Sequence, residues 1–313
     1  MIGRRLLLLG GVAALAGCTI GENVQWLPWT APSPLPVTVP DDVAGRIART
    51  DALAGHLLAN ASAWKLTGRR VTTLEWFRKA TAEHLQVVTS GDPARRQQAT
   101  AVPSSTPSPT QRTASGTQSA LTSELSALQS SHRDSARSAS GPAALLWASL
   151  AAFSATMTAV LPSGSGALGD DGTDLTPDLT GTGADRALQL AAQAAYSYEM
   201  ALAATGLGTA DTAALRVRLG QWRTLRAAIL TASPKIDAGT PPVAYDIRPA
   251  RNRSAARQLA AHTETMALPL LGAWLAGTSS AAERRLGVDA LIASNTALTS
   301  FGGTVLRWPG WPG

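Results

Sequence analysis

The sequence predicts an all-α protein built from two tandem four-helix bundles. Hydrophobic residues make up 45% of the chain but aromatic residues only 5%, so the apolar content is largely alanine and leucine. These two residues are strong helix formers, and β-branched or aromatic runs of strand length are scarce. Leucine and alanine also recur at the three- and four-residue spacing of amphipathic helices.

The first bundle is expected within residues 41–162. Asp41 and Asp42 suit a helix N-terminus, and Pro142 suits the start of the fourth helix. A loop rich in Ser, Thr and Pro should join the second and third helices. The apolar stripes predict four helices that carry Val43 to Trp64, Leu74 to Val88, Leu121 to Leu128, and Leu146 to Leu161.

Residues 163–183 contain almost no large apolar residue and are expected to be a linker between the bundles. Four aspartates in this stretch could suggest a calcium site, but their spacing does not match an EF-hand loop and no glutamate closes it. A solvated acidic linker is the preferred interpretation. Those aspartates are Asp170, Asp171, Asp174 and Asp178.

The second bundle is expected within residues 184–313. A long connection, Lys235 to Asn252, separates its second and third helices, as in the ferritin-like topology. Ser279 or Ser280, with Glu283, forms a capping-box pattern at the start of the fourth helix. The four stripes run from Asp185 to Thr205, Leu215 to Ile229, Leu259 to Trp274, and Leu286 to Ala297.

Residues 1–17 are typical of a secretory signal peptide, with Arg4 and Arg5 before a short apolar segment. That segment is shorter than the ~20 apolar residues that span a bilayer. It ends in Leu15-Ala16-Gly17-Cys18, which resembles the lipobox of bacterial lipoproteins. We therefore expect cleavage between Gly17 and Cys18, and lipid attached to Cys18. The Arg4-Arg5 pair leaves Sec and twin-arginine export both open.

This lipid would place the chain on the extracytoplasmic face of the cell membrane. Residues 18–40 then form a tether whose prolines favour polyproline II. Because Cys18 is the only cysteine, the chain can form no internal disulfide and no cysteine zinc cluster. The net charge is +6, but no run of Lys and Arg exceeds two residues, so no nucleic-acid partner is expected.

The second half also resembles a known family. The matching features are Leu190 to Glu199, the crossover Pro241 to Asp246, an alanine-rich fourth helix, and the terminal Trp308 to Gly313. In their order, these features resemble the ferritin-like domain of unknown function found in actinobacterial proteins, over about residues 184–313. The resemblance implies a four-helix bundle with at most an ancestral metal site, and it supplies no assigned activity.

A ferritin-like di-iron site requires Glu from two helices and Glu-x-x-His from two others. This sequence contains no Glu-x-x-His, and Gln193 stands where the resemblance implies Glu. We therefore expect no cofactor and no metal. The remaining candidate ligands are Glu199, His262 and Glu264. The alternative is that Glu199 pairs with Arg226 or Arg223 inside the bundle.

Three histidines of the first bundle, His56, His84 and His132, lie on different predicted helices. If they faced one interior they could bind zinc or haem iron, with Glu83 and Asp134 orienting them. No local spacing motif supports this, so solvated or core histidines are the preferred interpretation.

The sequence contains no nucleophile elbow, P-loop or dinucleotide-binding motif in the required context, and we predict no enzymatic activity. The leading hypothesis is a non-catalytic envelope lipoprotein whose helices bind a protein or lipid partner or act as a scaffold. The alternatives are a ferritin-like metalloprotein with an atypical site and a lipid- or solute-binding lipoprotein. The tryptophans near both ends, Trp26, Trp29, Trp308 and Trp311, would either dock a partner or cover bundle ends.

Overall fold

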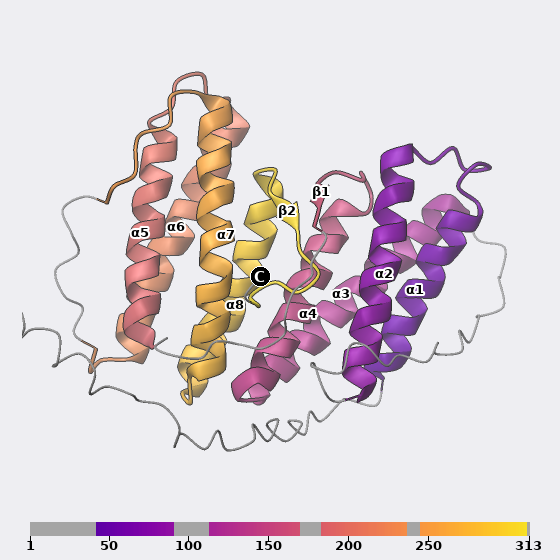
Figure 1. The fold of residues 1–313 in the computed structure, drawn as a ribbon, viewed down its shortest axis with the longest axis horizontal. Coiled ribbons are helices and arrows are strands. Elements are labelled where there is room, and N and C mark those ends of the chain that lie inside the picture. The colour runs from indigo at the N-terminus through magenta and orange to yellow at the C-terminus, as the bar shows by residue number, and fades with distance from the viewer. Residues whose placement is uncertain (1–41, 91–112, 170–182, 237–244, 312–313) are drawn as a thin grey trace, which may run out of the picture. The chain divides into compact units, whose positions relative to one another are not determined.

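The protein is almost entirely helical in the computed structural model, which describes residues 42–90, 113–169, 183–236 and 245–311 (Figure 1). The predicted all-α class is therefore confirmed. All described residues belong to one compact unit that spans Pro36–Gly313. The predicted signal peptide, Cys18, the tether, the four linker aspartates, Trp26 and Trp29 lie outside the described residues and stay predictions.

The first half contains α1 (Val43–Ala59), α2 (Gly68–Ser90), α3 (Ala114–Ser138) and α4 (Gly141–Val160). These helices coincide with the predicted stripes except at the end of the first, because Trp64 lies in a turn beyond α1. Asn60 ends that helix: its backbone N–H donates to the His56 carbonyl, and the backbone N–H of Ala61 donates to the Leu58 carbonyl. In the turn, Lys65 adopts a left-handed φ of 52°.

The second half contains α5 (Ala184–Leu202), α6 (Thr209–Ala232), α7 (Arg253–Gly277) and α8 (Ala281–Ser300). The Ser280 hydroxyl caps α8 by accepting from the backbone N–H of Glu283. The Glu283 carboxylate does not complete the predicted capping box, because it accepts from Trp274 and Thr278 instead. Half of the capping box is therefore present.

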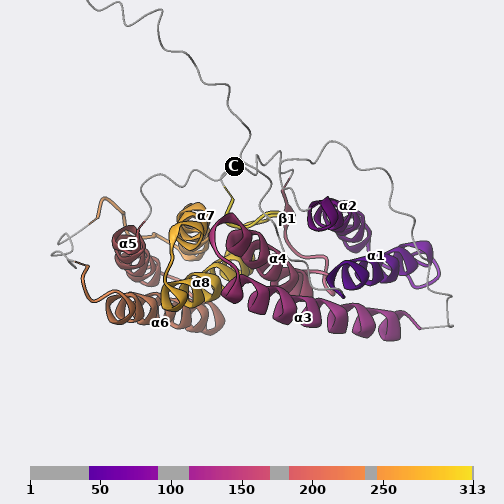
Figure 2. The ribbon, with the colours of Figure 1, turned by 90° about the horizontal axis from the view of Figure 1, so that it is seen from below.

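Helix packing joins the two halves. Helix α5 packs on α6 and α7, and α8 packs on α6 and α7; in the first half, α1 packs on α2 and α3, and α3 packs on α4. Helices α4, α7 and α8 pack against one another, and α3 also touches α8 (Figures 1 and 2). The larger hydrophobic cluster includes Val43, Leu146, Leu188, Leu219 and Leu291, so both halves contribute to one core.

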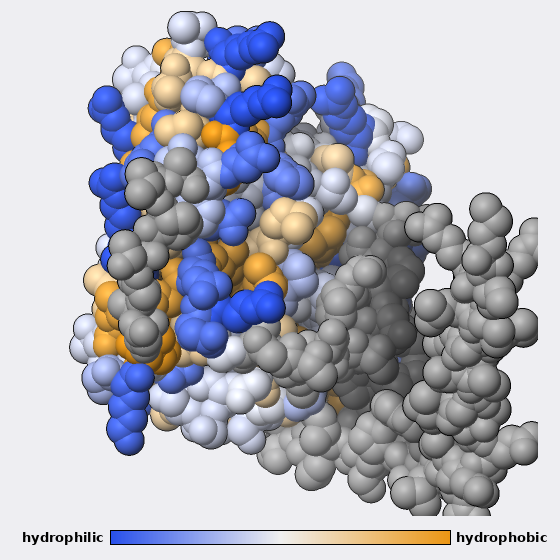
Figure 3. Space-filling view, turned by 60° about the vertical axis from the view of Figure 1, so that its left-hand side comes forward, coloured by the Kyte–Doolittle hydropathy of each residue, from blue (hydrophilic) through white to orange (hydrophobic). Residues whose placement is uncertain are grey.

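Helix α4 is the buried centre of this packing. Among the described helices, it alone is long and apolar enough to cross a membrane, with a mean hydropathy of 1.6 over a stretch that is 78% buried inside the protein. That burial is what the core helix of a folded protein shows. Large apolar side chains with high exposure in the described part are Val217 and Met266. Figure 3 shows hydrophilic side chains at the upper end of the face that carries α5.

The segment after α8 was not predicted to form regular structure. It forms β2 (Thr304–Val305), which pairs in parallel with β1 (Ala167–Leu168). The segment then enters the core, where Trp308 and Trp311 are 1% and 5% exposed. Both tryptophans are therefore part of the larger hydrophobic core. We call residues 304–311 the C-terminal strap.

The strap lies against helix backbones at two close approaches. A Cβ atom built on Gly272 of α7 would lie 1.9 Å from the Gly310 carbonyl oxygen. Gly310 itself has φ near 90° and sits against Leu291 of α8 and Leu145 of α4. Glycine is needed at both positions, because Gly272 leaves room for the strap and Gly310 adopts a backbone conformation that L-residues avoid.

Candidate functional site

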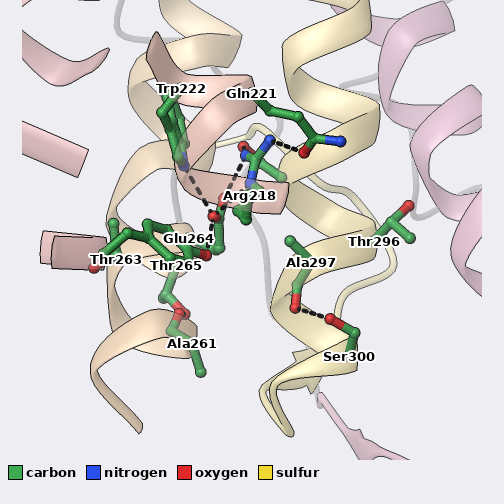
Figure 4. A network of polar contacts seen from close by, with 12 residues as sticks. Arg218, Gln221, Trp222, Ala261, Thr263, Glu264, Thr265, Thr296, Ala297 and Ser300 are labelled. Atoms are coloured by element: carbon green, nitrogen blue, oxygen red, sulfur yellow. Dashed lines mark hydrogen bonds and ion pairs between the residues drawn. The ribbon is translucent and has the colours of Figure 1, made fainter. Parts of the chain in front are cut away.

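Glu264 on α7 is fully buried, with 0% of its surface exposed. Arg218 on α6 binds it with two parallel hydrogen bonds, Nε to Oε1 and Nη2 to Oε2, both 2.8 Å long (Figure 4). The side chain of Arg218 is itself only 6% exposed. This bidentate geometry is the strongest form of carboxylate recognition by arginine.

Other side chains complete the network. The Tyr198 hydroxyl and the Trp222 indole N–H both donate to Oε1 of Glu264. Arg218 also donates to Ser294 and Gln221, and its guanidinium lies 4.5 Å from the centre of the Trp222 ring. The network therefore links α5, α6, α7 and α8, and both oxygens of Glu264 are occupied.

The electrostatics of this network are fixed by burial and by pairing. Burial lowers the pKa of Arg218, but the Glu264 carboxylate outweighs burial and holds the pKa above its ordinary value. Burial and then Glu264 raise the pKa of Tyr198 well above its ordinary range. The stable state is thus a charged Arg218–Glu264 pair beside a neutral Tyr198. The Tyr198 hydroxyl keeps its proton and donates a hydrogen bond to Glu264.

The three candidate metal ligands do not converge. Glu199 pairs with Arg223 at 2.7 Å on the surface, where the two side chains are 41% and 62% exposed. The predicted pairing with an arginine is therefore present, but outside the bundle interior. His262 is exposed on α7, and Glu264 is occupied by Arg218. Within the described ranges, no three His, Cys, Asp or Glu residues are placed to hold a metal ion.

Arg218 was missed by sequence reasoning, which considered Arg226 and Arg223 as the arginines that could form an ion pair inside the bundle. A signal was available, because Arg218 lies three residues after Leu215 and four before Trp222, at the spacing of one helix face. A basic residue within an apolar stripe requires a buried acid as its partner. Glu264, which is flanked by Thr263 and Ala267 in another buried stripe, is that partner.

Two of the three histidines of the first half come together. His84 and His132 are 3% and 2% exposed, and both line a cavity of about 10 Å³ between α1, α2, α3 and α4. His56 lies apart, with its ring edge against Trp64 at a centroid distance of 5.3 Å. Glu83 pairs with Arg307 of the strap, and Asp134 is exposed, so neither takes the orienting role considered from sequence.

The two cavity histidines differ in their bonding. Nε2 of His84 lies 2.9 Å from the Arg307 carbonyl, and its ring contacts Phe153 and Trp308 edge-on. His132 stacks on Trp147 and is nearly fully buried. Burial lowers the pKa of His132 to about 4, although a hydrogen bond with the Leu150 backbone partly offsets this. His132 is therefore neutral at pH 7.

Comparison with protein-family models, curated proteins and solved structures finds no match for this chain. The geometry thus defines an all-α protein with a saturated ion pair in the core of its second half and a small histidine-lined cavity in its first half.

Proposed function

We propose that this chain is a non-catalytic lipoprotein of the bacterial cell envelope. A lipid on Cys18 holds it on the extracytoplasmic face of the membrane, and its helical body acts as a binding or scaffold module for an envelope protein or lipid partner. The signal-peptide pattern and the single cysteine support the anchor. The first helix, α1, begins at Val43, after the proline-rich stretch that would serve as the tether.

The observation that carries the non-catalytic assignment is the state of Glu264. A carboxylate in a helical core serves as a metal ligand or a general base only if one of its oxygens is free to bind the metal ion or to take a proton. Both oxygens of Glu264 instead accept from Arg218, and Oε1 also accepts from Tyr198 and Trp222. The guanidinium supplies the positive charge that a metal ion would otherwise bring. A structural role for the network follows.

We further infer that the fold is two four-helix bundles with a shared core, the second of them ferritin-like. Support comes from the packing of α5 on α6 and α7 and of α8 on α6 and α7, which closes a ring of four helices. The connection between α6 and α7 spans residues 233–252, and the long connection in the middle of the bundle is the ferritin-like feature.

The anchor is tested by replacing Cys18. We expect the wild-type chain to incorporate a clickable palmitate analogue in bacterial cells and to fractionate with membranes. The Cys18→Ser variant should lose the label and accumulate as an unprocessed or soluble form. Labelling that persists in Cys18→Ser would refute the lipoprotein assignment, since the chain has no other cysteine.

The scaffold assignment is tested by elemental analysis of protein purified without chelator. We expect less than stoichiometric iron, manganese or zinc in a fully folded sample. Stoichiometric metal would instead favour the ferritin-like metalloprotein. A lipid carrier would need a cavity of ~300–1,000 Å³, whereas the cavity between the first four helices measures about 10 Å³.

A further inference from the structure

Arginines gather at one end of the second half, where α5 ends and α6 and α7 begin. This is the upper end of the three helices in Figure 1. The segment that leads into α7 lies along the end of α5, because the Ala250 N–H donates to the Met200 carbonyl and the Thr205 hydroxyl donates to the Arg251 carbonyl. This segment and the start of α7 hold what we call the arginine cluster, Arg248, Arg251, Arg253 and Arg257.

The nearby acids do not neutralise the arginine cluster. Asp211 on α6 pairs with both Arg253 and Arg257, and one carboxylate balances only one of the two charges. The side chain of Arg253 remains 63% exposed. Among the described residues the other two members of the cluster form no ion pair, and both are exposed. The segment itself contributes one further acid, Asp246, so this end keeps an excess of positive charge.

The helix dipoles add to this positive charge. The N-terminus of a helix carries partial positive charge, so acidic residues are favoured in its first turn and basic residues are not. The first turn of α7 contains no acidic residue, and Arg253 is the first residue of the helix. Helix α6 also begins at this end, at Thr209. An anion bound from outside would relieve the repulsion among these groups.

Apolar and aromatic side chains accompany the arginines. Ile247 is only partly buried and belongs to neither hydrophobic cluster of the described chain. Tyr245 is also partly exposed, and its ring centre lies 5.5 Å from that of Tyr196 on α5. Tyrosine is favoured at the boundary between lipid headgroups and acyl chains. A lipid surface therefore matches both kinds of side chain, whereas a soluble polyanion matches the arginines alone.

We propose that the arginine cluster, together with Ile247 and Tyr245, is a docking surface for the anionic headgroups of a phospholipid membrane. The guanidinium groups bind headgroup phosphates, which they recognise with paired hydrogen bonds. Ile247 enters the apolar boundary beneath the headgroups. This inference rests on the proposed envelope location only for the presence of a membrane, and it adds a second membrane contact to the lipid on Cys18.

The test uses the chain from residue 19 onward, which lacks the lipid anchor but contains the whole compact unit Pro36–Gly313. Its binding is measured by sedimentation with vesicles of phosphatidylglycerol and phosphatidylcholine in equal amounts. We expect binding that weakens as salt is added and that is absent with phosphatidylcholine alone. Each basic side chain near an anionic surface strengthens binding about fivefold, so Arg248→Ala with Arg251→Ala should weaken it about 25-fold.

The matched control is Arg69→Ala with Arg285→Ala, which removes the same charge from exposed positions elsewhere on the protein. The control should bind the anionic vesicles nearly as tightly as the unchanged chain. An equal loss in both double variants, or no vesicle binding by the unchanged chain, would overturn the proposal. Binding to polyphosphate without binding to vesicles would also overturn it. Each of these failures leaves the Cys18 anchor standing, because the tested chain carries no lipid.

A second measurement locates the contact. The chain from residue 19 onward has no cysteine, so Ile247→Cys can carry a single polarity-sensitive fluorophore. Anionic vesicles should shift its emission to shorter wavelength, which reports entry into an apolar environment. The same label on Thr224→Cys, at an exposed position of α6, should not respond. A protein that sediments with vesicles without a shift at Ile247→Cys would dock through another surface, which would contradict the proposal.

Discussion

Arg218 and Glu264 form the one ion pair of the described chain in which both side chains are nearly inaccessible, 6% and 0% exposed. The two residues lie on α6 and α7, which face each other diagonally across the ring of α5, α6, α8 and α7, and the pair is enclosed by Tyr198, Trp222 and Ser294. Removing two charges from water costs several kcal/mol per ion, which good geometry and additional hydrogen bonds must offset. The pair therefore makes the second half sensitive to the loss of either partner.

We expect Arg218→Ala to destabilise the protein by about 3–5 kcal/mol, because it leaves the Glu264 carboxylate buried without a counter-ion. Arg223→Ala is the matched control, since it removes an arginine from a pair that is largely exposed on the same helix. Such surface pairs contribute about 0–1 kcal/mol. Urea denaturation monitored by circular dichroism measures both. Equal losses for the two variants would contradict the assigned burial of Arg218.

Replacing both partners should be far less harmful than replacing one. In Arg218→Met with Glu264→Leu, neither charge remains in the core, and hydrophobic replacements of a buried pair are often neutral or stabilising by about 1–4 kcal/mol. We expect the double variant to be more stable than Arg218→Met alone. Denaturation of wild type, Arg218→Met, Glu264→Leu and the double variant gives the coupling energy. A double variant as unstable as the sum of its single changes would show that the two residues do not interact.

Stability should fall in mild acid because of His132. Its pKa is about 4 in the folded protein and ~6.5 when the chain unfolds. Between these pH values the unfolded chain binds more protons than the folded protein. The contribution of His132 to the free energy of unfolding is therefore fully present above pH 6.5, and it is lost as the pH falls toward 4. The loss amounts to about 3 kcal/mol at 1.36 kcal/mol per pKa unit.

The measurement is the free energy of unfolding at several pH values for wild type, His132→Leu and the control His56→Leu. Subtracting the variants removes the contribution of carboxylates that titrate in the same range. Asp42 contributes a small attractive charge to His132, and that contribution is common to wild type and the control. An unchanged pH dependence in His132→Leu would show that His132 binds its proton equally well in the folded and the unfolded protein.

Gly272 and Gly220 should respond oppositely to alanine. A Cβ on Gly272 would overlap the Gly310 carbonyl at 1.9 Å, so Gly272→Ala must displace the strap. Gly220 lies on the exposed face of α6 with nothing within 4 Å of an added Cβ. Gly220→Ala should therefore stabilise the protein by roughly 0.5–1 kcal/mol, the helix-propensity difference.

Thermal unfolding of the two glycine variants checks this pair of expectations. We expect Gly272→Ala to be destabilised by about 1–3 kcal/mol, the usual cost of overpacking. If the strap moves, Trp308 becomes exposed to solvent, and the tryptophan emission of Gly272→Ala should shift to longer wavelength. A Gly272→Ala protein as stable as wild type would mean that the strap does not pack on α7.

The helices were predictable because they rest on local information. Apolar periodicity located all eight described helices, and of the two serines considered for the start of α8, Ser280 is the cap. Trp64 was placed in the first helix because its spacing fits the stripe, whereas the chain turns at Asn60. Periodicity alone does not show where a turn interrupts an apolar pattern.

The features that were missed depend on contacts distant in sequence. Arg218 and Glu264 are 46 residues apart, and β1 pairs with a strand more than a hundred residues later. The cavity histidines were considered as a group, but only His84 and His132 meet. Which faces of separate helices come together is set by tertiary packing, and a single sequence does not record it.

The strap also constrains how the chain acquires its structure. Residues of the first half, among them His84, Trp76 and Leu145, complete their contacts with residues that follow α8. During synthesis the ribosome delivers these residues only after all eight described helices. A nascent chain that ends after α4 would therefore expose an apolar surface to solvent, and it would depend on chaperones or on the rest of the polypeptide to avoid aggregation.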